Sequence, residues 1–191
     1  MEEFLINKAI FLDRDGVINK DIEYLDDYNK FIFLPKVFDA IRLLNQNGYK
    51  VIIITNQSGV ARGFFTEEKL NLIHEKMTED IQKNNARIDS IYYCPHHPDF
   101  GSAQYKKDCE CRKPKIGLIL KAKKDFNIDL SHSFFVGDKI TDIVTGVNAR
   151  CKTILISDDS KKSKSEIETM NLKVDYITKD LFDAVTWILN Y

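Results

Sequence analysis

Residues 9–17 read AIFLDRDGV, a short apolar run with two aspartates directly after it. A continuous apolar run such as Ala9–Leu12 is typical of a strand that is covered on both faces of a parallel sheet. Asp13 and Asp15 then lie at the carboxyl end of that strand, where open α/β sheets bind their ligands. Because residues two apart in extended chain point the same way, and Gly16 lets the chain turn, we expect both carboxylates in one site. Taken alone, the pair fits a simple strand-to-loop turn equally well.

The same kind of apolar run recurs along the chain. Further strands are predicted at Val51–Thr55, Ile91–Cys94, Phe134–Val136 and Thr153–Ile156. Between and after them, helical patterns cover Val37–Asn47, Glu67 to about Asn84, Lys115–Phe126, Thr141–Ala149 and Leu181–Leu189. Alternation of strands and helices predicts an α/β fold, a doubly wound parallel sheet with helices on both faces. We expect a single domain over residues 1–191.

Composition excludes several classes of protein. The 191 residues are 43% hydrophobic and 30% charged with a formal net charge of −1, which is typical of a globular protein and gives no bulk charge for nucleic acid or a membrane surface. The N-terminus lacks the basic and apolar regions of a secretory signal, and no window approaches the ~20 apolar residues of a membrane span. We therefore expect a cytoplasmic monomer without a nucleic-acid or membrane partner.

Three further motifs follow predicted strands or precede a predicted helix. TNQSG, residues 55–59, ends the most apolar strand with small hydrogen-bond donors that suit a phosphate, although the same letters fit an ordinary loop. Arg112 and Lys113 lie just before a helix start, where cations and free backbone N–H groups come together, although a basic surface pair is the simpler interpretation. Asp138 and Asp142 follow the strand Phe134–Val136, and such acids suit Mg²⁺.

Taken together and in this order, the four motifs resemble the haloacid dehalogenase (HAD) superfamily of phosphohydrolases, over residues 9 to about 157. The strings FLDRDGVIN, TNQSGVARG, CRKPKIGL and VGDKITDI are similar to one branch, the D-glycero-D-manno-heptose 1,7-bisphosphate 7-phosphatases and the related histidinol-phosphate phosphatases. The resemblance implies a HAD-like fold without a large cap domain. It implies a Mg²⁺-dependent hydrolase acting on a sugar phosphate for lipopolysaccharide or other surface glycans, with histidinol phosphate in histidine synthesis as the alternative.

The resemblance also assigns roles at the carboxyl end of the first strand. Asp13 is the expected nucleophile, forming an aspartyl phosphate, and Asp15 the expected general acid and then base. The Mg²⁺ ligands it implies are the Asp13 carboxylate, the Asp15 backbone carbonyl and Asp138. Asp142 is expected to orient Lys113 or the metal shell rather than to bind Mg²⁺.

Further residues are assigned to the substrate. Thr55 and Asn56 are expected to bind the phosphoryl oxygens. Lys113, with Arg112, is expected to neutralise the charge on the transferring phosphoryl group. The full set of expected substrate contacts is Asp21, Tyr24, Thr55, Asn56, Gln57, Ser58, Arg62, Arg112, Lys113 and Lys139. Within it, Arg62 either contacts a distal phosphate or caps its own loop, and Glu23 stands where the family commonly has Gly.

A second group of potential metal ligands lies in residues 94–111, CPHHPDFGSAQYKKDCEC. Cys94, His96, Cys109 and Cys111 give one imidazole and three thiolates, a closed tetrahedral Zn²⁺ set that leaves no position for water. His97 is the competing ligand, but alternate residues of an extended segment face the same way, which favours His96. We expect a structural zinc that pins this loop.

Overall fold

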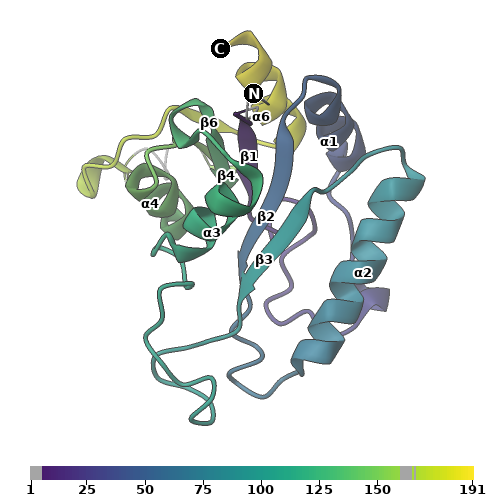
Figure 1. Ribbon diagram of the computed structural model, residues 1–191, viewed down its shortest axis with the longest axis vertical. Coiled ribbons are helices and arrows are strands. Elements are labelled where there is room, and N and C mark those ends of the chain that lie inside the picture. Colours follow the sequence, from purple (N-terminus) through teal and green to yellow (C-terminus); the bar gives the residue numbers. More distant parts are fainter. Residues whose placement is uncertain (1–5, 160–164, 166) are drawn as a thin grey trace, which may run out of the picture.

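The computed structural model describes residues 6–159, 165 and 167–191, and these form a six-stranded sheet (Figure 1). Its order is β3 (Ser90–Cys94), β2 (Lys50–Asn56), β1 (Ala9–Leu12), β4 (Phe134–Gly137), β5 (Lys152–Ile156) and β6 (Tyr176–Thr178). All five neighbouring pairs are parallel. The predicted doubly wound sheet is therefore confirmed. Sequence analysis missed β6, which has only three residues and too short an apolar run to signal a strand.

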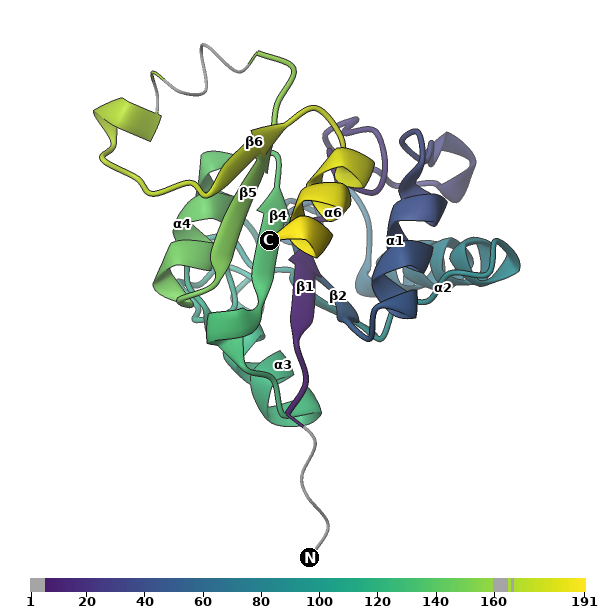
Figure 2. The ribbon, with the colours of Figure 1, turned by 90° about the horizontal axis from the view of Figure 1, so that it is seen from above.

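Helices cover both faces of the sheet. They are α1 (Val37–Gln46), α2 (Glu67–Lys83), α3 (Gly117–Phe126), α4 (Ile140–Asn148) and α6 (Leu181–Asn190). The view from above places α1, α2 and α6 on one face and α3 and α4 on the other (Figure 2). The five predicted helices are thus confirmed with small shifts at their ends. The largest shift is at α3, which begins two residues later than predicted; the backbone N–H groups of Lys115 and Gly117 donate to the Arg112 and Glu110 carbonyls in the preceding loop.

Strand residues alternate between two apolar cores. In β1, Ile10 and Leu12 pack in the core under α1, α2 and α6, whereas Ala9 and Phe11 pack in the core under α3. All four are fully buried. This burial on both faces explains why the strands of a parallel sheet are continuous apolar runs instead of alternating ones.

Two long connections leave the carboxyl edge of the sheet. Residues 13–36 follow β1 and contain one short 3₁₀ helix, Tyr28–Lys30, and residues 95–116 follow β3 without a helix or a named strand. Neither connection forms a cap domain, in agreement with the resemblance, which implied a fold without a large one. Across the described part of the chain, none of the helices has the length and apolar character that crossing a membrane would require.

Candidate active site

A buried lysine bridges two aspartates, Asp13 directly after β1 and Asp142 in the first turn of α4. Lys113 Nζ lies 2.9 Å from Asp13 Oδ1 and 2.6 Å from Asp142 Oδ1, and all three side chains are almost completely buried. Burial alone would lower the pKa of Lys113, but the two carboxylates outweigh it and raise that pKa. Lys113 is thus a fixed positive charge beside Asp13. The arrangement agrees with the expectation that Asp142 orients Lys113.

Three carboxylates converge beside this lysine. Oxygen atoms of Asp13, Asp138 and Asp142 all lie within 4.8 Å of one another. Burial raises the pKa of Asp13 to about 6, with Lys113 opposing it, and burial raises the pKa of Asp138 to about 7. A divalent cation would favour the ionised form of both groups, and Mg²⁺ prefers such oxygen ligands. This donor set fits a Mg²⁺ ion.

Ion pairing separates the three acids. Asp142 Oδ1 is in an ion pair with Lys113, and its Oδ2 accepts from the Lys139 backbone N–H at 3.1 Å. Asp138 Oδ1 is buried without a hydrogen-bond partner, as Asp142 Oδ1 is, but among the described residues no ion pair compensates it. Asp138 and Asp13 are therefore better placed than Asp142 to hold a cation. The expected contribution of Asp15, a backbone carbonyl, stays a prediction.

Gly16 lets the loop after β1 approach the cluster of Asp13, Asp138 and Asp142. Its φ of +84° is in the left-handed region, and a Cβ at this position would collide with the Asp138 carboxylate. Gly137 at the end of β4 has the same function toward Asp142, whose side chain occupies the space of a Cβ. The two glycines in DRDG and VGDK are therefore required by the close packing of the acidic cluster.

The side chains that contact the Asp15 carboxylate differ from the one that contacts Asp13. Arg14 Nη2 lies 3.0 and 2.8 Å from its two oxygens, and Asn19 Nδ2 and Gln57 Nε2 each donate at 2.9 Å. Burial would raise the pKa of Asp15, but Arg14 and these hydrogen bonds outweigh it and lower that pKa. Asp15 is an ionised acceptor here. Arg14 and Asn19 did not appear among the predicted site residues, although both lie within the FLDRDGVIN string.

Residues of the TNQSG loop are also held by internal contacts. Thr55 Oγ1 accepts a hydrogen bond from Gln57 Nε2 at 2.9 Å, which leaves the Thr55 hydroxyl proton available for a ligand oxygen. The Asn56 side chain binds the Lys113 backbone on both sides, accepting from its N–H at 3.0 Å and donating to its carbonyl at 3.2 Å. Asn56 therefore fixes the segment that carries Lys113. The backbone carbonyl of Ser58 accepts from the Arg62 N–H at 3.0 Å.

The predicted specificity residues form two groups around these acids. Lys139 Nζ lies 2.8 Å from Asp21 Oδ2, which joins the loop after β4 to the loop after β1. The Arg62 guanidinium lies 3.9 Å from the ring centroid of Phe100 and 5.9 Å from that of Tyr24. These contacts connect the loop after β2 with residues 94–111. They favour the capping role of Arg62 over the distal-phosphate role.

The four predicted zinc ligands meet in residues 94–111. The sulfur atoms of Cys94, Cys109 and Cys111 are 3.1 to 3.5 Å apart, and His96 Nδ1 lies 3.1 Å from Cys111 Sγ. Such separations are close to the roughly 3–4 Å between ligands around a tetrahedral zinc ion. His97 lies outside the set, since its Nδ1 accepts from the Asp99 N–H at 3.1 Å. The cluster is therefore suited to hold Zn²⁺.

The cysteine cluster is continuous in sequence with Arg112 and Lys113. Arg112 follows Cys111 directly, and its Nη1 donates to the His96 carbonyl at 3.2 Å. Lys113 is the next residue, so a metal that fixes the cluster would also fix the segment from which both cations project. The structure thereby joins the two groups of potential metal ligands through a single stretch of chain.

Comparison with known proteins identifies relatives over nearly the whole chain. Residues 9–181 match the family described as polynucleotide kinase 3 phosphatase. The D-glycero-beta-D-manno-heptose-1,7-bisphosphate 7-phosphatase of Haemophilus influenzae is 41% identical over 178 residues, 93% of this chain and 95% of the relative. The protein of the same name from Escherichia coli K12 is 37% identical over 182 residues, 95% of this chain and 88% of the relative. Among solved structures, the D,D-heptose 1,7-bisphosphate phosphatase of B. bronchiseptica, complexed with magnesium and phosphate, has a TM-score of 0.82 and 32% identity, covering 96% of this chain and 98% of that chain.

Proposed function

Because the chain belongs to the polynucleotide kinase 3 phosphatase family and to the D-glycero-beta-D-manno-heptose-1,7-bisphosphate 7-phosphatases, we propose that it removes the 7-phosphate from this β-anomeric sugar. The relatives make it a phosphoric monoester hydrolase. The reaction would be a step in the synthesis of nucleotide-activated heptose. The observation that carries the proposal is the buried Asp13 carboxylate, held by Lys113 and facing Asp138.

Phosphoryl transfer to Asp13 would use the groups around it. An Asp13 oxygen would attack phosphorus as the bond to the sugar oxygen breaks, and Asp15 would protonate the leaving oxygen. Lys113 and the Thr55 hydroxyl would stabilise the charge on the transferring group. Mg²⁺, held by the Asp13 and Asp138 carboxylates and the Asp15 carbonyl, would supply charge neutralisation between nucleophile and phosphate.

Asp15 would have to change partners during the reaction. Its oxygens accept from Arg14, Asn19 and Gln57, an arrangement that suits the ionised base and not the protonated acid. For the first step it must therefore take up a proton and loosen its contact with Arg14. In the second step it would return to this position and accept a proton from the water that hydrolyses the aspartyl phosphate.

The test is Mg²⁺-dependent phosphate release from purified protein. The α and β anomers of D-glycero-D-manno-heptose 1,7-bisphosphate are compared with histidinol phosphate, and we expect the highest kcat/KM for the β anomer. Preference for histidinol phosphate would instead assign the protein to histidine synthesis. No release from any of the three would refute the proposed substrate class.

A variant tests the nucleophile. Asp13→Asn should keep the fold and the zinc but release no phosphate, because the amide cannot form the acyl phosphate. Circular dichroism and metal analysis serve as controls for folding. Substantial Mg²⁺-dependent turnover by this variant would contradict the assignment of Asp13.

A further inference from the structure

A completely buried arginine connects the Asp15 carboxylate to a histidine on an outer helix. Arg14 has no exposed surface, and its Nη2 and Nε contact Asp15. Its other terminal nitrogen, Nη1, lies 3.0 Å from Nε2 of His74 in α2. Because a guanidinium can only donate, His74 Nε2 must be the acceptor in this bond. The ring therefore carries its proton on Nδ1.

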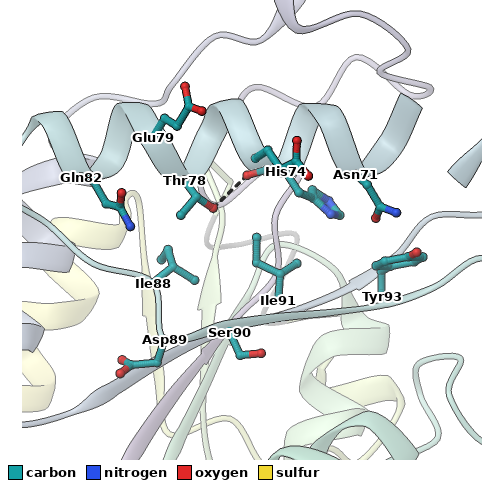
Figure 3. A pocket seen from close by; sticks show the side chains of 11 residues that line it. Asn71, His74, Thr78, Glu79, Gln82, Ile88, Asp89, Ser90, Ile91 and Tyr93 are labelled. Atoms are coloured by element: carbon teal, nitrogen blue, oxygen red, sulfur yellow. Dashed lines mark hydrogen bonds between the residues drawn. The ribbon is translucent and has the colours of Figure 1, made fainter. Parts of the chain in front are cut away.

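His74 lies between this network and a groove on the surface. Its ring projects from α2 toward β3 and borders a groove of about 550 Å³, with Tyr93 and Ile91 on the opposite wall (Figure 3). The centroids of the His74 and Tyr93 rings are 5.7 Å apart. Burial, and then the charge of Arg14, lower the pKa of His74 to about 3. The ring thus stays a neutral acceptor throughout the working pH range.

Within the described part of the chain, every side chain that hydrogen-bonds to the Asp15 oxygens is a donor. These donors are Arg14, Asn19 and Gln57. Gln57 is itself fixed, since its Oε1 accepts from Arg14 at 3.2 Å and its Nε2 also binds Thr55. The orientation of Arg14 therefore determines where the Asp15 carboxylate rests, and His74 satisfies the Arg14 nitrogen that points away from the active site.

We propose that His74 is a positioning residue for the second half of the reaction, acting through Arg14 to hold Asp15 where it serves as the base. The inference rests on the proposed aspartyl-phosphate mechanism. In that step the water oxygen bonds to phosphorus, and the bond from phosphorus to the Asp13 oxygen breaks, returning its electron pair to the Asp13 carboxylate. One water proton passes to Asp15. Without His74, a buried Arg14 N–H loses its acceptor, so the guanidinium turns to find another and Asp15 moves with it.

The test is His74→Leu, assayed with Mg²⁺ and p-nitrophenyl phosphate. We expect kcat to fall at least about tenfold, a fraction of the 10²–10⁴ that a positioned base contributes, and KM to fall with it, so that kcat/KM changes less than about threefold. Rapid mixing should then reveal a burst of p-nitrophenolate approaching one per active site. His74→Gln offers an amide oxygen as acceptor to Arg14 and should restore most of kcat.

Met77→Ala is the matched control, because Met77 lies one turn further along α2, is fully buried and packs in the apolar core. It should lower the melting temperature without a burst. The inference is overturned if His74→Leu keeps the kcat of the native protein. It is also overturned if His74→Leu lowers kcat and kcat/KM equally, as Met77→Ala does. Should His74→Leu not fold, His74→Phe, which keeps a ring but removes the acceptor, carries the test, with the same split expected and the same outcomes overturning it.

The proposed function fails in a different way. If the native protein hydrolyses a chiral phosphate ester with inversion of configuration at phosphorus, water attacks directly and the aspartyl-phosphate mechanism is wrong, because a covalent intermediate requires two displacements and net retention. If the native protein forms that intermediate and His74→Leu hydrolyses it at the native rate, only the role of His74 is wrong.

Discussion

Replacing Lys113 by methionine removes the charge that holds two buried carboxylates together. Lys113 Nζ lies within 3 Å of oxygen atoms of Asp13 and Asp142, and its side chain is 2% exposed. Methionine has a similar length and no charge, so the substitution leaves packing largely intact. What changes is that two neighbouring, almost completely buried acids lose their shared cation.

The expected loss of stability follows from that geometry. Breaking a buried ion pair by removing one partner costs about 3–5 kcal/mol, because the remaining charge is left uncompensated. Protonation limits the loss, and the pKa of Asp13 is already raised to about 6 by burial. Each further unit of increase in that pKa corresponds to about 1.4 kcal/mol. We therefore expect Lys113→Met to lose about 3–5 kcal/mol at pH 8 and clearly less at pH 5.

Urea unfolding measures this loss. The single tryptophan, Trp187, lies on α6, is partly buried and packs on Tyr176 and Phe134 against the core, so its fluorescence reports global unfolding. The double variant Lys113→Met/Asp142→Asn is the control. Asparagine at 142 can still accept the Lys139 N–H but carries no charge, so it should recover about half of the lost free energy of unfolding.

Phosphate release should be abolished in both variants, because neither has the Lys113 ammonium beside Asp13 that would stabilise the charge of the transferring group. The reasoning is refuted if Lys113→Met loses less than about 1 kcal/mol at pH 8, or if the double variant is less stable than the single one. Either result would mean that the buried charges are compensated by something other than Lys113.

Other perturbations have equally definite outcomes. Cys109→Ser should lose zinc and phosphatase activity together, whereas Cys151→Ser, which replaces a buried thiol outside the cluster, should keep its zinc, as measured by metal analysis. Full activity of zinc-free Cys109→Ser would contradict the structural role. Mg²⁺ should raise the melting temperature more at pH 8 than at pH 5. Burial raises the pKa of Asp138 from 3.8 to about 7, so between these values the metal-free folded protein binds more protons than the unfolded chain and loses stability as the pH rises. An increase in melting temperature that is equal at both pH values would contradict this. Gly16→Ala should cost about 1–2 kcal/mol for its left-handed φ and also weaken Mg²⁺ binding, because its Cβ displaces Asp138. Gly48→Ala, with φ +77° and open space around its Cβ, should lose stability only, and equal Mg²⁺ affinity in both glycine variants, measured by titration calorimetry, would be the contrary result.

Local sequence determined the elements of the sheet and most of their order. Continuous apolar runs define strands buried on both faces, and the fully buried Ile10 and Phe11 show why such a run has no polar alternation. The Cys94, His96, Cys109 and Cys111 spacing likewise predicted the cluster that the structure assembles. The apolar runs and the Cys/His spacing are both short-range patterns that follow from the geometry of an extended chain. They can therefore be recognised in the sequence without knowledge of the fold.

Only the tertiary structure decided which polar groups satisfy one another inside the fold. Asn56 reads as a phosphate ligand, yet its side chain binds the backbone of Lys113, 57 residues away. Arg14 and His74 are 60 residues apart and meet only because the fold brings α2 against the loop that follows β1. A buried donor or acceptor must find a partner, but which one it finds depends on distances across the packed core. For that reason the sequence predicted the acids and the cation of the site, and the packing determined how each is held.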